Sequence, residues 1–198
     1  MQRLILASGS ETRLSLLRSA GVRVEPKRVR IDEPSIRDSL RAEAASGRDI
    51  ADHLAETKAR KASQKTPDAT VVGCDQVLEF QEDILGKAQS PDALKATLNA
   101  LNGKRHKLYS AAVICENSHP VWRFVGTATL HMRRCDPGYL DAYVDRNWDT
   151  VRHCVGGYKL EEEGIRLFHR IDGDYFTILG IPLIELLAYL TNKGLIEG

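Results

Sequence analysis

The chain has 198 residues, 42% of them hydrophobic and 28% charged, which is the composition of an ordinary folded protein rather than a disordered one. Its 28 basic and 27 acidic side chains leave a formal net charge of +1, so no global field attracts nucleic acid or an anionic membrane. The apolar stretches are far shorter than the roughly 20 residues of a membrane span, and the first residues lack the apolar segment of a signal peptide. We therefore expect a single cytoplasmic domain, residues 1–198, with neither a membrane nor a nucleic acid as partner.

The cysteines and histidines are too scattered to suggest a zinc site. No two cysteines are spaced as CxxC, and no two histidines as HxxxH. The sequence therefore favours reduced core thiols over metal ligands at Cys74, Cys115, Cys135 and Cys154.

The N-terminal residues predict a strand, a short loop and a helix. Residues 4–7 are a continuous apolar run, Ser10 can cap the helix that follows, and Gly21 can end it. Backbone N–H groups at such a loop, together with the helix dipole, favour an anion beside Ser8 and Ser10. Arg13, in the first helical turn, could add a guanidinium that binds phosphate bidentately. A plain helix cap beside a surface arginine would explain the same residues.

A second helix is predicted over residues 50–63, after a short strand at 22–29 and a polar surface segment at 37–48. Most of its apolar side chains share one arc of the helix, yet Lys58 projects from near the middle of that arc. Burying an unpaired ammonium costs several kcal/mol. Lys58 therefore either extends past its neighbours to solvent or meets an anion, and the pattern alone does not separate the two.

The middle of the chain predicts a buried strand at residues 70–75 with Asp75 at its carboxyl end, where open α/β sheets place their ligands. A helix over 90–101 and a hairpin of strands 107–116 and 121–134 follow, and a last helix runs from Pro182 to Gly194. The expected fold class is α/β, with a mixed sheet and flanking helices.

Several of these candidate residues together suit a phosphate-rich ligand. Asp32-Glu33 and Asp75 supply carboxylates that could hold a hard divalent cation such as magnesium. Lys87, after a small turn, could reach a phosphate as Lys58 could, although each of them alone is as readily a surface residue. Two carboxylates, two lysines, Arg13 and a helix N-terminus would together balance a metal-bound triphosphate.

The order and spacing of these residues resemble the Maf family over nearly the whole chain. The matching segments are Leu6-Ala7-Ser8-Gly9-Ser10 with Arg13, Asp32-Glu33, Leu54-Ala55 with Lys58-Ala59, Gly73-Cys74-Asp75-Gln76-Val77, Ile84-Leu85-Gly86-Lys87, Gly156-Gly157-Tyr158 with Glu161, Ile171-Asp172-Gly173-Asp174-Tyr175, and Gly180-Ile181-Pro182-Leu183.

The resemblance implies an enzyme that uses a divalent metal, Mg or Mn, to convert a nucleoside triphosphate to its monophosphate and pyrophosphate, clearing noncanonical nucleotides. It also implies a fold similar to that of inosine triphosphate pyrophosphatases, with two closely packed lobes around a cleft, and a homodimer among the expected partners. The implied catalytic base is Asp75, which with Glu33 would hold the metal. The implied phosphate-binding residues are Ser8, Ser10, Arg13, Lys58 and Lys87, and those that set base preference are Thr12, Gln76 and Glu161. Gln76 and Glu161 resemble the branch that acts on 7-methyl-GTP.

The chain also departs from the usual pattern of that family. Glu11 and Leu14 stand where a proline and an arginine are usual, Thr12 stands in place of a bulky aromatic residue, and Ala88 replaces a proline. These departures leave open an alternative, a nucleotide-binding regulatory protein that has lost catalysis. A nucleic-acid-binding module, suggested by Arg133 with its neighbouring arginine, is disfavoured by the near-neutral charge.

Overall fold

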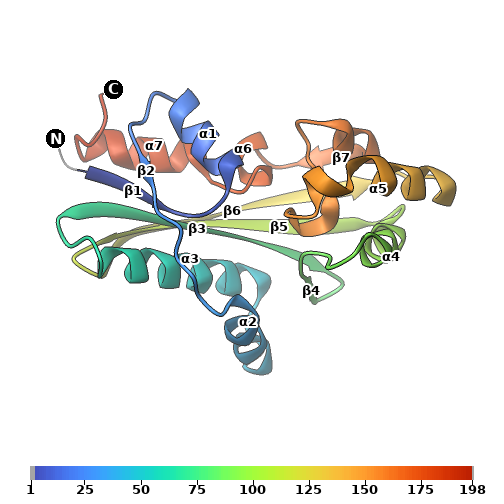
Figure 1. Cartoon of the computed structure of the whole chain (residues 1–198), viewed down its shortest axis with the longest axis horizontal. Helices are drawn as coiled ribbons and strands as arrows, with labels where there is room; N and C mark the ends of the chain where they lie inside the picture. The colour runs from blue at the N-terminus through green and yellow to red at the C-terminus, as the bar shows by residue number, and fades with distance from the viewer. Residues whose placement is uncertain (1–2, 198) are drawn as a thin grey trace. The chain divides into compact units, whose positions relative to one another are not determined.

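The computed structural model describes residues 3–197, which form a mixed sheet of seven strands flanked by helices (Figure 1). The strand order is β2-β1-β3-β5-β6-β7, and β4 pairs with β3. The strands are β1 (Arg3–Ala7), β2 (Glu25–Pro26), β3 (Ala69–Phe80), β4 (Asp83–Leu85), β5 (Arg105–Glu116), β6 (His119–Met132) and β7 (Phe168–Asp172). The predicted α/β class with a mixed sheet is confirmed.

The helices lie between and after these strands in the chain. They are α1 (Glu11–Ser19), α2 (Glu33–Ala42), α3 (Gly47–Ser63), α4 (Pro91–Leu101), α5 (Pro137–Val151), α6 (Tyr175–Ile178) and α7 (Leu183–Asn192), with two short 3₁₀ helices, η1 (Val155–Gly157) and η2 (Glu163–Leu167). Among residues 3–197, none of the helices combines the length and the apolar character that crossing a bilayer requires.

The described residues form two compact units, each built from separate stretches of the chain. The first contains residues 3–76, 109–126 and 175–197, and the second contains residues 77–108 and 127–174. The long strands β3, β5 and β6 contribute residues to both.

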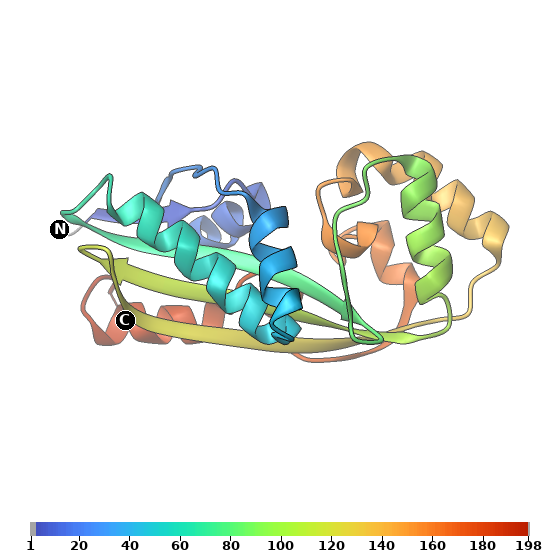
Figure 2. The ribbon, with the colours of Figure 1, turned by 90° about the horizontal axis from the view of Figure 1, so that it is seen from below.

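In the first unit, helices cover both faces of the sheet. Figure 1 shows α3 on one face and α1 with α7 on the other, and Figure 2 shows α3 running along the strands with α2 beside it. Leucines of α1 and α7 pack with Leu6, Val72 and Cys74 in one cluster, whereas Ile5 and Val71 pack on the opposite face. Strands covered on both faces bury every side chain, which explains their continuous apolar runs.

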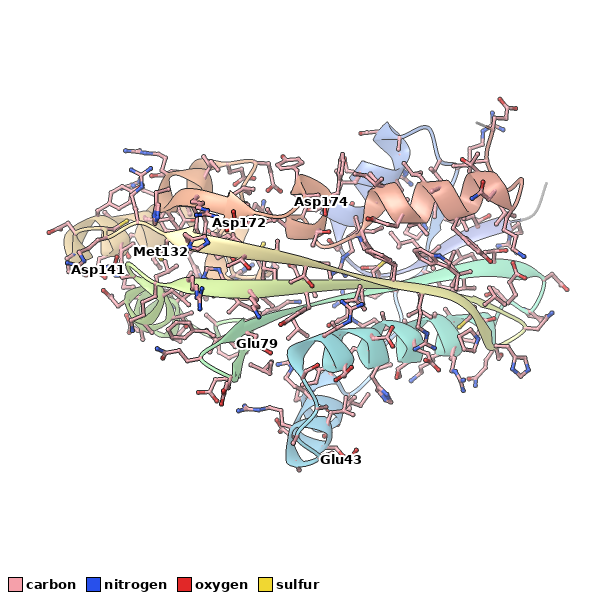
Figure 3. The ribbon with its side chains drawn as sticks, turned by 180° about the vertical axis from the view of Figure 1, so that it is seen from behind. Glu43, Glu79, Met132, Asp141, Asp172 and Asp174 are labelled. Carbon is pink, nitrogen blue, oxygen red and sulfur yellow. The ribbon has the colours of Figure 1, made fainter. Side chains whose placement is uncertain are left out.

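The second unit packs α4 against α5 and η1, and pairs β7 with β6 in antiparallel register. Met132, opposite Phe168, and Asp172, opposite Thr129, mark the two ends of this pairing (Figure 3). Its interior holds an aromatic group in which His106 forms a hydrogen bond of 2.6 Å with the Tyr158 hydroxyl. The predicted single domain over residues 1–198 stays a prediction.

The sequence predicted four helices and the long hairpin, and gave the bounds of two strands incorrectly. The strand expected at 22–29 is reduced to Glu25–Pro26, because Pro26 has no N–H for a ladder. The strand expected at 70–75 continues to Phe80, so Asp75 lies inside β3 rather than at its end. The predicted helices correspond to α1, α3, α4 and α7, and the predicted hairpin to β5 and β6.

Besides the four-residue α6, two helices were missed. The polar segment 37–48 is largely exposed, as expected, but much of it belongs to α2, which has no fully buried residue. Its signals are the cap at Asp32, a proline in the first turn and a stripe of only two half-buried apolar residues, Ile36 and Leu40. The second missed helix is α5.

Candidate active site

Gly73 lets helix α3 lie very close to strand β3. A Cβ atom at this position would stand 2.6 Å from the Ala59 backbone nitrogen and 2.8 Å from the Ala59 Cβ, both of them parts of α3 that cannot yield cheaply. Glycine is thus required for this close approach. Because side chains alternate along a strand, Asp75 projects on the same face as Gly73 and towards α3.

Lys58 meets two carboxylates on that face. Its Nζ lies 2.5 Å from Oδ1 of Asp75 and 2.7 Å from Oε1 of Glu33. The side chains of Lys58 and Asp75 are only 10% and 8% exposed, whereas Glu33 is 34% exposed. Of the two explanations for a lysine in the apolar arc of this helix, the anion is the one the structure bears out. Two carboxylates against one ammonium leave the group with a net negative charge.

Glu33 owes its position to the cap of α2. Asp32 is the N-cap residue, and its side chain accepts hydrogen bonds from the Ser35 backbone N–H (3.2 Å) and the Ser35 hydroxyl (2.9 Å). Glu33 begins the helix itself and turns towards Lys58. Asp32 therefore caps the helix, whereas Glu33 faces Lys58.

The loop after β1 is organised by Arg13 and two serines. Ser10 caps α1, where its hydroxyl accepts from the Arg13 backbone N–H at 3.4 Å. Ser8 is buried, and its hydroxyl accepts from the Ser10 backbone N–H and from Nη1 of Arg13, both at 3.2 Å. The predicted helix cap at Ser10 is confirmed.

The Arg13 guanidinium is committed largely to the protein itself. Nε donates to the Gly180 carbonyl at 2.7 Å, and Nη1 donates to the Cys74 carbonyl at 3.2 Å as well as to Ser8. Nη2 makes no hydrogen bond within residues 3–197 and is the nitrogen left for a ligand. The bidentate contact that the sequence suggested would require one of the other nitrogens to release its partner.

These residues meet where β1 ends. β1 runs parallel to β3, and their pairing stops at Ala7 and Gly73. Asp75 therefore lies just past the carboxyl end of β1, although it is in the interior of its own strand. Parallel sheets bind ligands at the carboxyl ends of their strands. Asp75 lies at such an end, but the end is that of β1 rather than that of β3.

Gln76 projects on the opposite face from Asp75. Its Nε2 donates to the Ser110 hydroxyl at 3.0 Å and to the carbonyls of Thr177 (3.2 Å) and Ile178 (2.9 Å). Thr12, in the first turn of α1, is half-buried. The sequence drew attention to both residues but not to Ser110, the polar residue within the buried apolar run of β5, nor to the role of the Gly180 carbonyl.

Lys87 and Glu161 belong to the second unit, and both are exposed there. They lie near a common neighbour, Cys154, whose thiol pKa is raised by burial, lowered by Lys159 and Lys87, and raised by Glu161. The roles of Lys87 and Glu161 with phosphate and base stay predictions.

The carboxylates suit a magnesium ion that the substrate helps to hold. Within residues 3–197, no group of three or more His, Cys, Asp or Glu side chains is arranged to hold a metal. Magnesium is commonly bound by only one or two protein carboxylates and completes its shell with water and phosphate oxygens. Glu33 and Asp75, which contact a common ammonium, fit that pattern.

Comparisons with known proteins find relatives of this chain over nearly its full length. A family model described as Maf-like protein matches residues 3–193. The nucleoside triphosphate pyrophosphatase of Ruegeria pomeroyi is 56% identical over 98% of both chains, and that of Roseobacter denitrificans is 58% identical over 98% of this chain and 97% of its own. The 7-methyl-GTP pyrophosphatase of Brucella abortus is 40% identical over 99% and 98%.

Among solved structures, the Ham1 protein of Staphylococcus aureus aligns with 66% of this chain and 72% of its own, at 16% identity and a TM-score of 0.44. A likeness of that degree assigns no function.

Proposed function

The chain belongs to the Maf family and is a nucleoside triphosphate pyrophosphatase, and on this premise we propose that the group of Glu33, Lys58 and Asp75 is its catalytic centre. The reaction adds water to the α-phosphorus and breaks the bond between the α-phosphorus and the oxygen that bridges to the β-phosphorus. The products are a nucleoside monophosphate and pyrophosphate. The observation that carries the proposal is the buried ammonium of Lys58 between two carboxylates, at the carboxyl end of β1.

Asp75 is the proposed general base. Its Oδ1 is held by Lys58, whereas Oδ2 makes no hydrogen bond within residues 3–197 and can accept a proton from water. Lys58 fixes the orientation of the carboxylate through the short contact at Oδ1. A base held in one orientation directs water towards a single phosphorus atom, which is the geometric requirement for proton transfer.

The phosphates are proposed to lie at the start of α1. Nη2 of Arg13 and the backbone N–H groups of the first turn offer donors there, and the helix dipole favours an anion. Lys58 adds a positive charge on the side of Asp75. Charges fixed in place before the reaction stabilise the negative charge that develops on the leaving pyrophosphate.

Glu33 and Asp75 would hold the divalent cation, magnesium or manganese, through their carboxylate oxygens. When bound, such a cation acidifies water and offsets phosphate charge. Its role is proposed from the hard oxygen donors of the pair and from the negative charge left by two carboxylates and one ammonium.

For the base we propose a modified nucleotide, with 7-methyl-GTP as the candidate. The name of the Brucella abortus relative supports this choice. We propose that the protein clears such nucleotides in the cytoplasm. The homodimer expected from the family stays a prediction. A preference for dTTP and UTP in a panel of triphosphates would contradict this choice of base.

The catalytic role is tested with Asp75→Asn. The variant should bind nucleotide like the wild type but release pyrophosphate about 10²–10⁴-fold more slowly, the range for loss of a general base. Asp32→Asn is the matched control, because its side chain caps α2 and still offers an oxygen acceptor. Unchanged pyrophosphate release by Asp75→Asn would remove this residue from the role. A wild type that binds nucleotide and releases no pyrophosphate would instead favour the regulatory protein.

A further inference from the structure

Ser110 is a fully buried hydroxyl in β5 of the first unit, and both of its hydrogen-bonding functions are in use. Its Oγ donates to the Thr177 carbonyl at 2.6 Å and accepts from Nε2 of Gln76 at 3.0 Å. With no exposed surface, this hydroxyl cannot touch a substrate. Any influence it has must act through its neighbours.

The hydroxyl fixes the orientation of the Gln76 side chain. Since the Ser110 proton is committed to Thr177, its oxygen can only accept, and the carbonyls of Thr177 and Ile178 can also only accept. An amide turned by 180° would present its oxygen to these acceptors. The amide nitrogen is therefore held against residues 177–178.

The same segment ends at the atom that orients Arg13. Two residues after Ile178, the carbonyl of Gly180 accepts from Nε of Arg13 at 2.7 Å. Gly180 has a φ of +102°, and a Cβ atom there would lie 3.1 Å from Nε and Nη2, so the guanidinium packs directly on this glycine. Hydrogen bonds and the four consecutive residues 177–180 thus connect Ser110 to the phosphate side of the site.

From this connection we infer that Ser110 is a positioning residue for Arg13. Acting through Gln76 and residues 177–180, it holds the Gly180 carbonyl where it sets the plane of the guanidinium and the direction of Nη2. The inference rests on the proposed function in placing Nη2 of Arg13 at the phosphates. It also gives Gln76 a task on the phosphate side, in addition to the base preference implied by the family.

The first test compares Ser110→Ala with Ser63→Ala. Ser63 is equally buried in the same unit, and its hydroxyl accepts a backbone hydrogen bond from Ser118 at 2.9 Å, within the hairpin turn. Affinity for pyrophosphate alone is measured by calorimetry for both variants. Ser110→Ala should weaken it about tenfold, as expected for one coupled interaction, and Ser63→Ala should leave it unchanged. Equal affinities in the two variants would overturn the inference.

The second test places Ser110→Ala in an Arg13→Lys background. Lysine has no guanidinium, so the Gly180 carbonyl would no longer set the orientation of the side chain at position 13. Ser110→Ala should then cost nothing further, and in the wild-type background it should lower kcat/KM by the same factor for every nucleotide. An equal loss in both backgrounds, or a loss that depends on the base, would refute the role.

Failure of this inference is distinguishable from failure of the proposed function. A wild type that releases no pyrophosphate from any nucleotide refutes the function, whereas the affinity comparison concerns Ser110 alone. Rescue by Ser110→Thr, which restores a hydroxyl, should recover the affinity lost in Ser110→Ala. Recovery of thermal stability without recovery of affinity would count against positioning.

Discussion

Replacing Lys58 by methionine should destabilise the protein strongly, because it leaves two carboxylates facing one another without their ammonium. Methionine keeps the length and the apolar packing of the lysine stem while removing the charge. Asp75 is nearly buried and loses its contact at 2.5 Å, and Glu33 loses its contact at 2.7 Å. The buried carboxylate of Asp75 cannot turn to solvent, whereas that of Glu33 is already one-third exposed.

The magnitude follows from the burial of the two pairs. Removing one partner of a buried ion pair costs about 3–5 kcal/mol, since an uncompensated charge stays behind. The more exposed contact with Glu33 belongs nearer to the range of surface pairs, about 0–1 kcal/mol. Asp75 should therefore account for most of the loss. Against a total stability of about 5–15 kcal/mol, Lys58→Met would remove a large fraction.

Urea unfolding at neutral pH measures this loss. Lys61→Met is the matched control on the same helix: its ammonium donates to the Arg30 carbonyl at 2.7 Å in an exposed position, so the expected cost is below about 1 kcal/mol. Adding Asp75→Asn to Lys58→Met should recover part of the stability, because one carboxylate is neutralised. A Lys58→Met variant as stable as its control would refute the buried ion pair.

Two further predictions concern packing and pH. Gly73→Ala should cost about 1–3 kcal/mol of stability and lower activity, since the new methyl group would displace α3 at Ala59 and with it the Lys58 ammonium. Calorimetric melting measures the first effect and pyrophosphate release the second. An unchanged Tm would contradict the close approach of α3 and β3. Burial lowers the pKa of His106 to about 4 from its ordinary 6.5, so between these values the unfolded chain binds a proton that the folded chain does not. The free energy of unfolding should fall by about 3 kcal/mol as the pH drops from 6.5 to about 4. Urea titrations at both pH values should show a smaller fall for His106→Gln.

The sequence revealed the catalytic centre through residues that contradict their surroundings. Lys58 stands in an apolar helical arc, and Asp75 follows an apolar run, so each needs a partner that only a folded structure can supply. The cost of burying an ammonium left two alternatives for Lys58, solvent or an anion, and the structure shows the anion. No close approach was predicted at Gly73, although a glycine inside a strand can mark one, and the structure shows it.

Other parts of the site carry no such local signal. The Gly180 carbonyl that holds Arg13 is 167 residues away in the chain, and any residue type has a carbonyl. Ser110 interrupts an apolar run, but a buried serine commonly bonds to the nearest backbone, so the pattern did not indicate its partner. Helix α2, which carries Glu33, has no fully buried residue, and its cap alone would not hold it. Its existence depends on tertiary contacts with α3.

The charge of the catalytic centre explains why its residues occur together. A triphosphate alone would be repelled by Glu33 and Asp75, because one ammonium cannot neutralise both carboxylates. A triphosphate that arrives with a divalent cation reverses this relation, since the cation suits the carboxylates and the phosphates suit Arg13 and the start of α1. In the free protein Lys58 keeps the two carboxylates close enough to act as one site. If the proposed catalytic centre is correct, a substitution of Lys58 should lower both stability and pyrophosphate release.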